Sequence, residues 1–137
     1  MGLFKRIYKG WKTAGYWTEA LDFYTKDKPI KSLVYLKKYN LIRPFKSKEK
    51  TLQGLVYYEL KKVDQAVECF RWAFDNIGQD KRQNIDEDKY LATYIISTLG
   101  KICNEHNIEI DILDEKLKDY NFDKSKVRKA FIWAFPL

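Results

Sequence analysis

The sequence has few cysteines and histidines, which stabilise many secreted proteins and bind metals, and it lacks the long apolar runs of membrane proteins. Its 137 residues include two cysteines, one histidine and three prolines. Cys69 and Cys103 stand far apart and outside any C-x-x-C motif, which is typical of a reduced, intracellular protein. Two cysteines and one histidine in this arrangement do not predict a zinc site. No apolar run of about 18 residues occurs, so no transmembrane helix is predicted.

The N-terminus also lacks sorting signals. No apolar run of about 7–15 residues follows the basic start, so we expect no signal peptide and a cytoplasmic location. Met1-Gly2 begins like a myristoylation signal, but Arg6 stands where that signal needs Ser or Thr.

Proline and glycine are scarce, and this scarcity favours long helices. Six glycines and three prolines leave uninterrupted segments, and 45% of the residues are hydrophobic. The composition therefore predicts a single folded all-α domain. Ile108, Ile110 and Ile112 alternate as in a strand, but no second strand is available for pairing, so a helix is predicted there as well. The apolar periodicity predicts seven or eight helices, over about residues 3–12, 16–25, 29–42, 48–60, 63–77, 86–103, 108–120 and 123–135.

The net charge of +7 belongs to the first third of the chain. Residues 1–46 contain eleven Lys/Arg and three Asp/Glu, whereas residues 47–137 contain fifteen and sixteen. A localised basic field attracts an acidic protein surface, nucleic acid or anionic lipid. Alternatively, the excess of 21 lysines over five arginines reflects biased composition, and the lysines serve only as solvated residues.

Small and aromatic residues recur at helical spacing in one stretch, as Gly54-x-x-Tyr57 followed by Ala66-x-x-x-Phe70-x-x-Ala73. This stretch resembles the tetratricopeptide repeat, a helical hairpin of about 34 residues with the pattern W-x2-L-G-x2-Y, then A-x3-F, then P. The match is partial, because other residues stand at the Trp, Leu and Pro positions of the pattern: Lys50, Gln53 and Gly78.

The resemblance divides the chain into units. Residues 47–80 are one repeat, and residues 13–46 are a degenerate repeat with Ala20 and Phe23 at the positions of Gly54 and Tyr57. Residues 1–12 then form an N-terminal capping helix, and residues 81–137 form a long helix plus a C-terminal helical cap. In a competing register, the turn between helices lies at Gly15 and residues 1–34 are the first unit. Either register implies a short right-handed α-solenoid of helix hairpins.

Tetratricopeptide proteins bind other proteins and carry out no catalysis, and the first helix of each unit lines their concave face. Trp, Tyr and Arg dominate interface energies, although buried aromatics also build cores. Carried onto this sequence, the resemblance implies eight partner-binding residues: Trp17, Tyr24, Lys48, Thr51, Leu55, Tyr58, Arg82 and Lys89.

A search for catalytic residues yields one weak candidate. Cys103-x-x-His106 places a thiol and an imidazole on one helical face. Cys103 continues an apolar stripe, so we expect a buried core cysteine beside a histidine at the helix end. The sequence contains neither a Gly-x-Ser-x-Gly motif nor a phosphate-binding glycine loop. No enzyme activity, metal or cofactor is expected.

The predicted function is therefore to hold or neutralise a dedicated protein partner with an acidic surface, as a bacterial immunity protein or antitoxin does. A small secretion-type chaperone belongs to the same class. The alternatives are nucleic-acid binding by the Lys-rich first third, with Phe4, Tyr8, Trp11 and Trp17 as stacking surfaces, and membrane association by the basic amphipathic helix 2–12. The apolar segment 131–137 either closes the solenoid or forms a homodimer.

Overall fold

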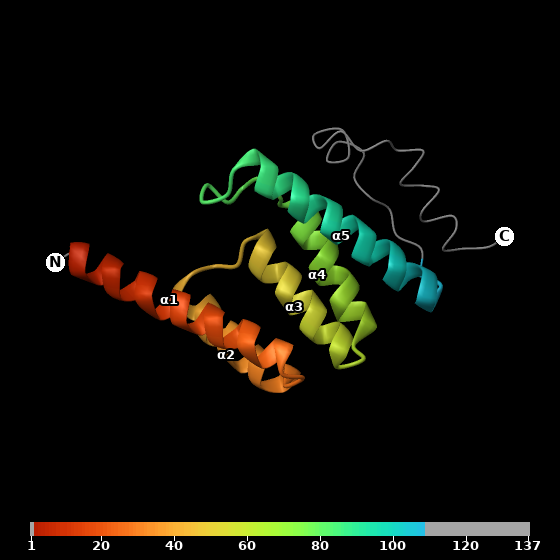
Figure 1. Cartoon of the computed structure of the whole chain (residues 1–137), viewed down its shortest axis with the longest axis horizontal. Coiled ribbons are helices and arrows are strands. Elements are labelled where there is room, and N and C mark those ends of the chain that lie inside the picture. Colours follow the sequence, from red (N-terminus) through yellow and green to blue (C-terminus); the bar gives the residue numbers. More distant parts are fainter. Residues whose placement is uncertain (1, 109–137) are drawn as a thin grey trace.

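The computed structural model describes residues 2–108, which form five α-helices and no strand. α1 packs against α2, and α3 packs against α4, as two helical hairpins. α2 also contacts α3, and α4 contacts α5, so the elements follow one another in chain order (Figure 1). The predicted all-α class is confirmed. The helices are α1 (Gly2–Thr25), α2 (Pro29–Ile42), α3 (Ser47–Glu59), α4 (Val63–Asp75) and α5 (Ile85–His106).

Six of the seven or eight predicted helices fall within residues 2–108, and the structure has five helices there. The break predicted near Gly10 to Gly15 is wrong, because α1 runs through both glycines as one helix of 24 residues. A helix-interior glycine costs only about 1 kcal/mol relative to alanine, which weakens a helix without ending it when no proline follows. Gly15, where the competing register places a turn, lies inside α1. The helices predicted over residues 108–120 and 123–135 lie outside the described residues.

Local sequence signals set most of the other boundaries. Pro29 occupies the first turn of α2, where its missing N–H is not needed. Arg43 is extended (φ −135°, ψ 121°), as a residue before proline prefers, and it ends α2. The Asn84 side chain accepts a 2.8 Å hydrogen bond from the Glu87 backbone N–H and caps α5.

The turns within the two hairpins match each other at a spacing of 34 residues. Thr25 and Glu59, the last residues of α1 and α3, are 34 positions apart. Asp27 and Lys61, also 34 positions apart, both adopt a left-handed conformation, with φ of 56° and 62°. The residue after each donates a backbone hydrogen bond five positions back, at 2.8 Å in the first hairpin and 2.9 Å in the second. The two hairpins therefore close through the same backbone turn.

Two hydrophobic clusters lie on either side of α3. The first cluster joins α1, α2 and α3 through Ala20, Leu36, Leu52 and Val56. The second and larger cluster joins α4 and α5, with Leu55 and Tyr58 of α3 packed against it. Opposite faces of α3 thus serve different cores, which ties the first hairpin to the rest of the protein. The buried members of the second cluster are Ala66, Val67, Phe70, Ala73, Phe74, Ile77, Ala92, Ile95, Ile96, Leu99 and Ile102.

Candidate protein-binding face

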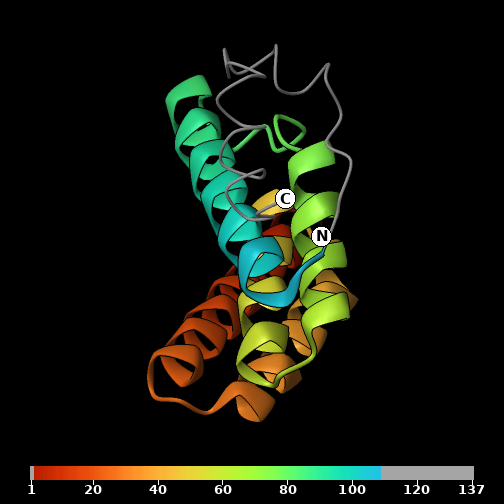
Figure 2. The ribbon, with the colours of Figure 1, turned by 90° about the vertical axis from the view of Figure 1, so that its right-hand side faces the viewer.

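Side chains from α1, α3 and α5 meet on one side of the molecule. Figure 2 shows α1 and α5 to the left, α2 and α4 to the right, and α3 between them. Contacts between side chains connect the three helices of the left side, as the next paragraphs describe. We call this surface the α1–α3–α5 face and define it by six residues: Trp17, Leu21, Tyr24, Lys48, Tyr58 and Tyr94.

Trp17 and Lys48 connect α1 to α3. The Lys48 ammonium lies 5.0 Å from the centre of the Trp17 ring, within the range of a cation–π interaction. The Trp17 ring also lies near Tyr39, with ring centres 6.2 Å apart, and the indole stays partly exposed. The structure therefore brings these two predicted site residues together and leaves both accessible to a partner.

Tyr24, on α1, packs against the first hydrophobic cluster and lies near enough to Glu59 of α3 and Tyr94 of α5 for both to affect its pKa. Partial burial raises the pKa of its hydroxyl, and the nearby Tyr94 and Glu59 raise that pKa further. Tyr94, on α5, keeps 40% of its surface exposed. Two tyrosines from α1 and α5 thus add aromatic surface to the same face.

Tyr58 connects α3 to α5. Its hydroxyl donates a 2.6 Å hydrogen bond to the Glu105 carboxylate, which raises the pKa of Tyr58, and its ring meets His106 edge-on with centres 5.9 Å apart. Thr51, in contrast, is only 5% exposed and donates its hydroxyl to the Ser47 carbonyl. Thr51 therefore supports α3 and has almost no surface to offer a partner.

The other predicted residues differ in their surroundings. Leu55 is half-buried against the second cluster. Lys89 is exposed on α5. Arg82 lies in the loop before α5, where its Nε donates to Asp80 at 2.8 Å and one of its terminal nitrogens donates to Glu49 at 2.9 Å. These two ion pairs hold the Arg82 guanidinium in place, so its position is set by contacts within the protein.

The ion pairs of Arg82 belong to a buried network that joins both hairpins. Tyr39, on α2, donates its hydroxyl to Glu49, on α3, and Glu49 has no exposed surface. The Arg82 hydrogen bonds lower the pKa of Asp80, whereas burial and the bond to Glu49 raise the pKa of Tyr39. Sequence reasoning missed Tyr39, Glu49 and Asp80, because 31 or more positions separate the first two from Asp80 and no local motif links them.

A small basic cavity lies beside this network, at the edge of the α1–α3–α5 face. Its volume is about 190 Å³. Arg43, Lys48 and Arg82 line it together with Thr13, Trp17 and other residues, and no carboxylate is among its described lining residues. Arg43 and Lys48 form no ion pair with a described carboxylate. This corner of the face therefore favours an anionic group.

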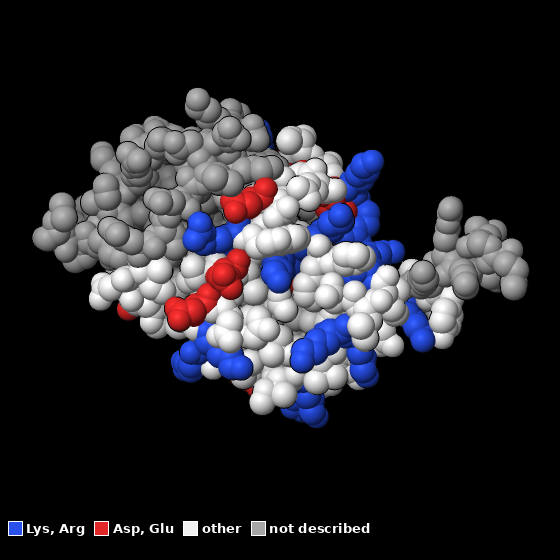
Figure 3. All heavy atoms as spheres, turned by 180° about the vertical axis from the view of Figure 1, so that it is seen from behind, with Lys and Arg blue, Asp and Glu red and all other residues white. Residues whose placement is uncertain are grey.

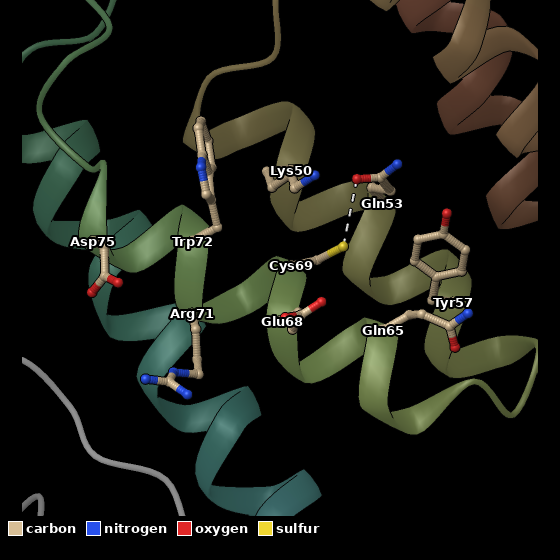
Figure 4. A pocket seen from close by; sticks show the side chains of 9 residues that line it. All are labelled: Lys50, Gln53, Tyr57, Gln65, Glu68, Cys69, Arg71, Trp72 and Asp75. Atoms are coloured by element: carbon tan, nitrogen blue, oxygen red, sulfur yellow. Dashed lines mark hydrogen bonds between the residues drawn. The ribbon is translucent and has the colours of Figure 1, made fainter.

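A larger hollow of about 410 Å³ opens between α3 and α4 (Figure 4). Its charges are mixed, with Lys50 and Arg71 against Glu68 and Asp75. The Cys69 thiol contacts the Gln53 side chain at 3.5 Å, and burial raises the pKa of that thiol. Seen from behind the view of Figure 1, Lys and Arg side chains are spread widely over the described surface, and Asp and Glu show at fewer places (Figure 3). This mixed hollow identifies no particular ligand.

The weak catalytic candidate is a core residue. Cys103 is fully buried, as expected, and burial raises its pKa to about 11. His106 is exposed and packs against Tyr58. Within residues 2–108, no group of three or more potential metal ligands comes together.

Comparison of the chain with protein families, curated proteins and solved structures finds no match. In the part of the chain that the structure describes, no helix combines the length and apolar character needed to cross a bilayer.

Proposed function

We propose that this chain is a non-enzymatic protein-binding module that holds one dedicated partner on its α1–α3–α5 face. The observation that carries the proposal is the pair of contacts across this face: Trp17 with Lys48, and Tyr58 with Glu105. Each contact fixes a partly exposed aromatic ring between two helices. Rings that are already ordered lose little entropy on binding, which makes them effective interface residues.

We also propose that the two hairpins are tetratricopeptide-like repeats of a short right-handed solenoid. The matched turns at a spacing of 34 residues support this assignment, as does the small residue Gly54 against the Phe70 ring. In such an array the first helix of each hairpin faces the ligand, which agrees with a binding face formed by α1, α3 and α5.

The charges favour a partner with an acidic surface. Residues 1–46 carry eight more basic than acidic residues, and the small basic cavity adds Arg43 and Lys48 at the edge of the face. Such charge accelerates encounter with an acidic protein and guides its orientation. An immunity protein or an antitoxin acts by binding and blocking one partner protein. We propose the same role for this chain.

Affinity capture from the source cell, followed by binding measurements with the purified partner, tests the proposal. Tyr94→Ala and Lys48→Glu should each weaken binding, by about tenfold or more. The matched control is Trp72→Ala, an exposed aromatic on α4 that lines the mixed hollow. Circular dichroism checks that all three variants fold.

Two results would count against this function. Loss of binding on Trp72→Ala, with Tyr94→Ala unaffected, would place the partner at the hollow between α3 and α4. Capture of nucleic acid instead of protein, with an affinity for generic DNA or RNA that falls steeply with salt, would favour the nucleic-acid alternative.

A further inference from the structure

The first half of α1 turns apolar side chains away from the rest of the protein. Ile7 and Trp11 are 60% and 82% exposed, whereas Ala20 is fully buried. Trp11 and Ala20 are nine residues apart, which is two and a half helical turns, so they lie on opposite sides of α1. An exposed tryptophan beside an exposed isoleucine marks an interaction surface.

Gly15 continues this surface. Ile7, Trp11 and Gly15 follow one another at intervals of four residues, so they form one ridge along the helix. A Cβ atom built at Gly15 would meet no atom within 4 Å, whereas one built at Gly54 would lie 3.0 Å from the Phe70 ring. Gly10 and Gly100 are open in the same way, but of these three glycines Gly15 is the one that follows Ile7 and Trp11 on the ridge. A second helix that approaches closely over this ridge would fill the open space.

The charges of α1 indicate which helix fits. Residues 2–13 contain four Lys/Arg and no acidic residue, whereas residues 14–25 contain Glu19 and Asp22 and no basic residue. Lys12 and Glu19 flank the ridge on the same side, at about 100° and 80° from its centre, whereas the other three basic positions lie further round the helix. When two copies of α1 lie antiparallel around Gly15, Lys12 of each copy therefore comes near Glu19 of the other. A parallel pair would leave Lys12 of one copy and Glu19 of the other about 10 Å apart along the helix axis.

We propose that a second copy of this chain docks antiparallel on the ridge of Ile7, Trp11 and Gly15, around a two-fold axis close to Gly15. The two-fold axis makes each contact occur twice, and each Trp11 lies against the other copy's helix beyond Gly15. Trp11 and Trp17 lie on different sides of α1, because six residues separate them by about 120°. Self-association therefore leaves the α1–α3–α5 face free, and it does not depend on the function proposed above.

Sedimentation velocity of the full chain over about 5–500 µM tests the proposal, since a contact between two helices is smaller than a standard interface. The wild type should form a dimer within this range. Trp11→Glu and Gly15→Gln should each raise the dimer dissociation constant by about tenfold or more. The matched control is Leu41→Glu, at an apolar side chain on α2 that is 88% exposed, and this variant should dimerise like the wild type.

A cross-linking experiment tests the position of the axis. Gly15→Cys should form a disulfide-linked dimer on mild oxidation, whereas Lys31→Cys on α2 should not. The native Cys69 and Cys103 are both buried, so they should not interfere.

Three outcomes would overturn the proposal. The wild type could stay monomeric throughout the range, or its dimer could be insensitive to both ridge variants, which would place the interface elsewhere. The protein could also remain monomeric and bind vesicles of phosphatidylserine and phosphatidylcholine in a way that Trp11→Glu abolishes. That result would assign the ridge to a membrane surface.

Discussion

The two hairpins share a backbone turn but differ in what they bury. In the second hairpin, Phe70 is fully buried and its ring lies against Gly54. In the first hairpin, the positions 34 residues earlier are Leu36 and Ala20, and the Ser32 hydroxyl donates a 2.7 Å hydrogen bond to the Ala20 carbonyl. The second hairpin thus buries an aromatic ring at this position, whereas the first buries an aliphatic side chain and keeps ring contacts such as Phe23 with Tyr35 at partly exposed positions. The same turn geometry is therefore compatible with two different kinds of packing between the helices.

The largest expected effect comes from removing the central side chain of each hairpin. Phe70→Ala should lower the free energy of unfolding by about 4 kcal/mol, because it leaves a large cavity in the second cluster. Leu36→Ala should lower it by about 3 kcal/mol, because the side chain is smaller. Urea unfolding followed by circular dichroism measures both. A larger loss for Leu36→Ala would contradict the view that the second hairpin carries the main core.

The next largest effect concerns the network that joins the two hairpins. Arg82→Ala should lower the free energy of unfolding by about 3 kcal/mol, because it leaves the buried Glu49 carboxylate without a cation. Lys81→Ala, at an exposed neighbouring position, should have little effect. Denaturant unfolding of both variants tests the difference, and equal stabilities would show that the network contributes nothing.

The same network should make stability depend on pH. The folded pKa of Asp80 lies below its unfolded value of about 3.9, so its contribution is present above that pH and is lost as the pH falls through the lower folded pKa. Asp80→Asn should therefore be less stable than the wild type at pH 7, and this difference should narrow as the pH falls toward about 2. The exposed Glu19→Gln is the control. A difference that stays constant from pH 7 to pH 2 would exclude a role for the Asp80 charge.

Much of the fold follows from local signals, and one error shows their limit. Pro29, the Arg43-Pro44 pair and the acidic first turn of α5 act within a few residues, so the helix boundaries near them could be predicted. The break predicted near Gly10 and Gly15 failed because glycine weakens a helix by only about 1 kcal/mol. Gly15 was informative in a different way, as the open position on an exposed ridge.

The candidate site was predictable only where the repeat spacing applies. The resemblance indicated Trp17 and Lys48 together, and their side chains do meet. The network of Tyr39, Glu49 and Arg82 could not be predicted, because α2, α3 and the loop before α5 come together only in the folded chain. Tyr94 was not among the predicted binding residues, because a half-exposed tyrosine at a helix edge has the same spacing as a buried one.

The smallest expected effect tests whether the two turns are equivalent. Lys61 and Asp27 both adopt positive φ, which is unfavourable for a residue with a Cβ and less so for Asp than for Lys. Lys61→Gly should therefore raise the free energy of unfolding by about 0.5–1 kcal/mol, and Asp27→Gly should raise it by a smaller amount. Thermal and urea unfolding of the two variants measure these shifts. The opposite result for the first turn would be that Lys61→Gly stabilises the protein while Asp27→Gly clearly destabilises it. The Asp27 side chain would then stabilise the first turn in a way that Lys61 does not stabilise the second. The two turns would share a backbone conformation but differ in how their side chains contribute to stability.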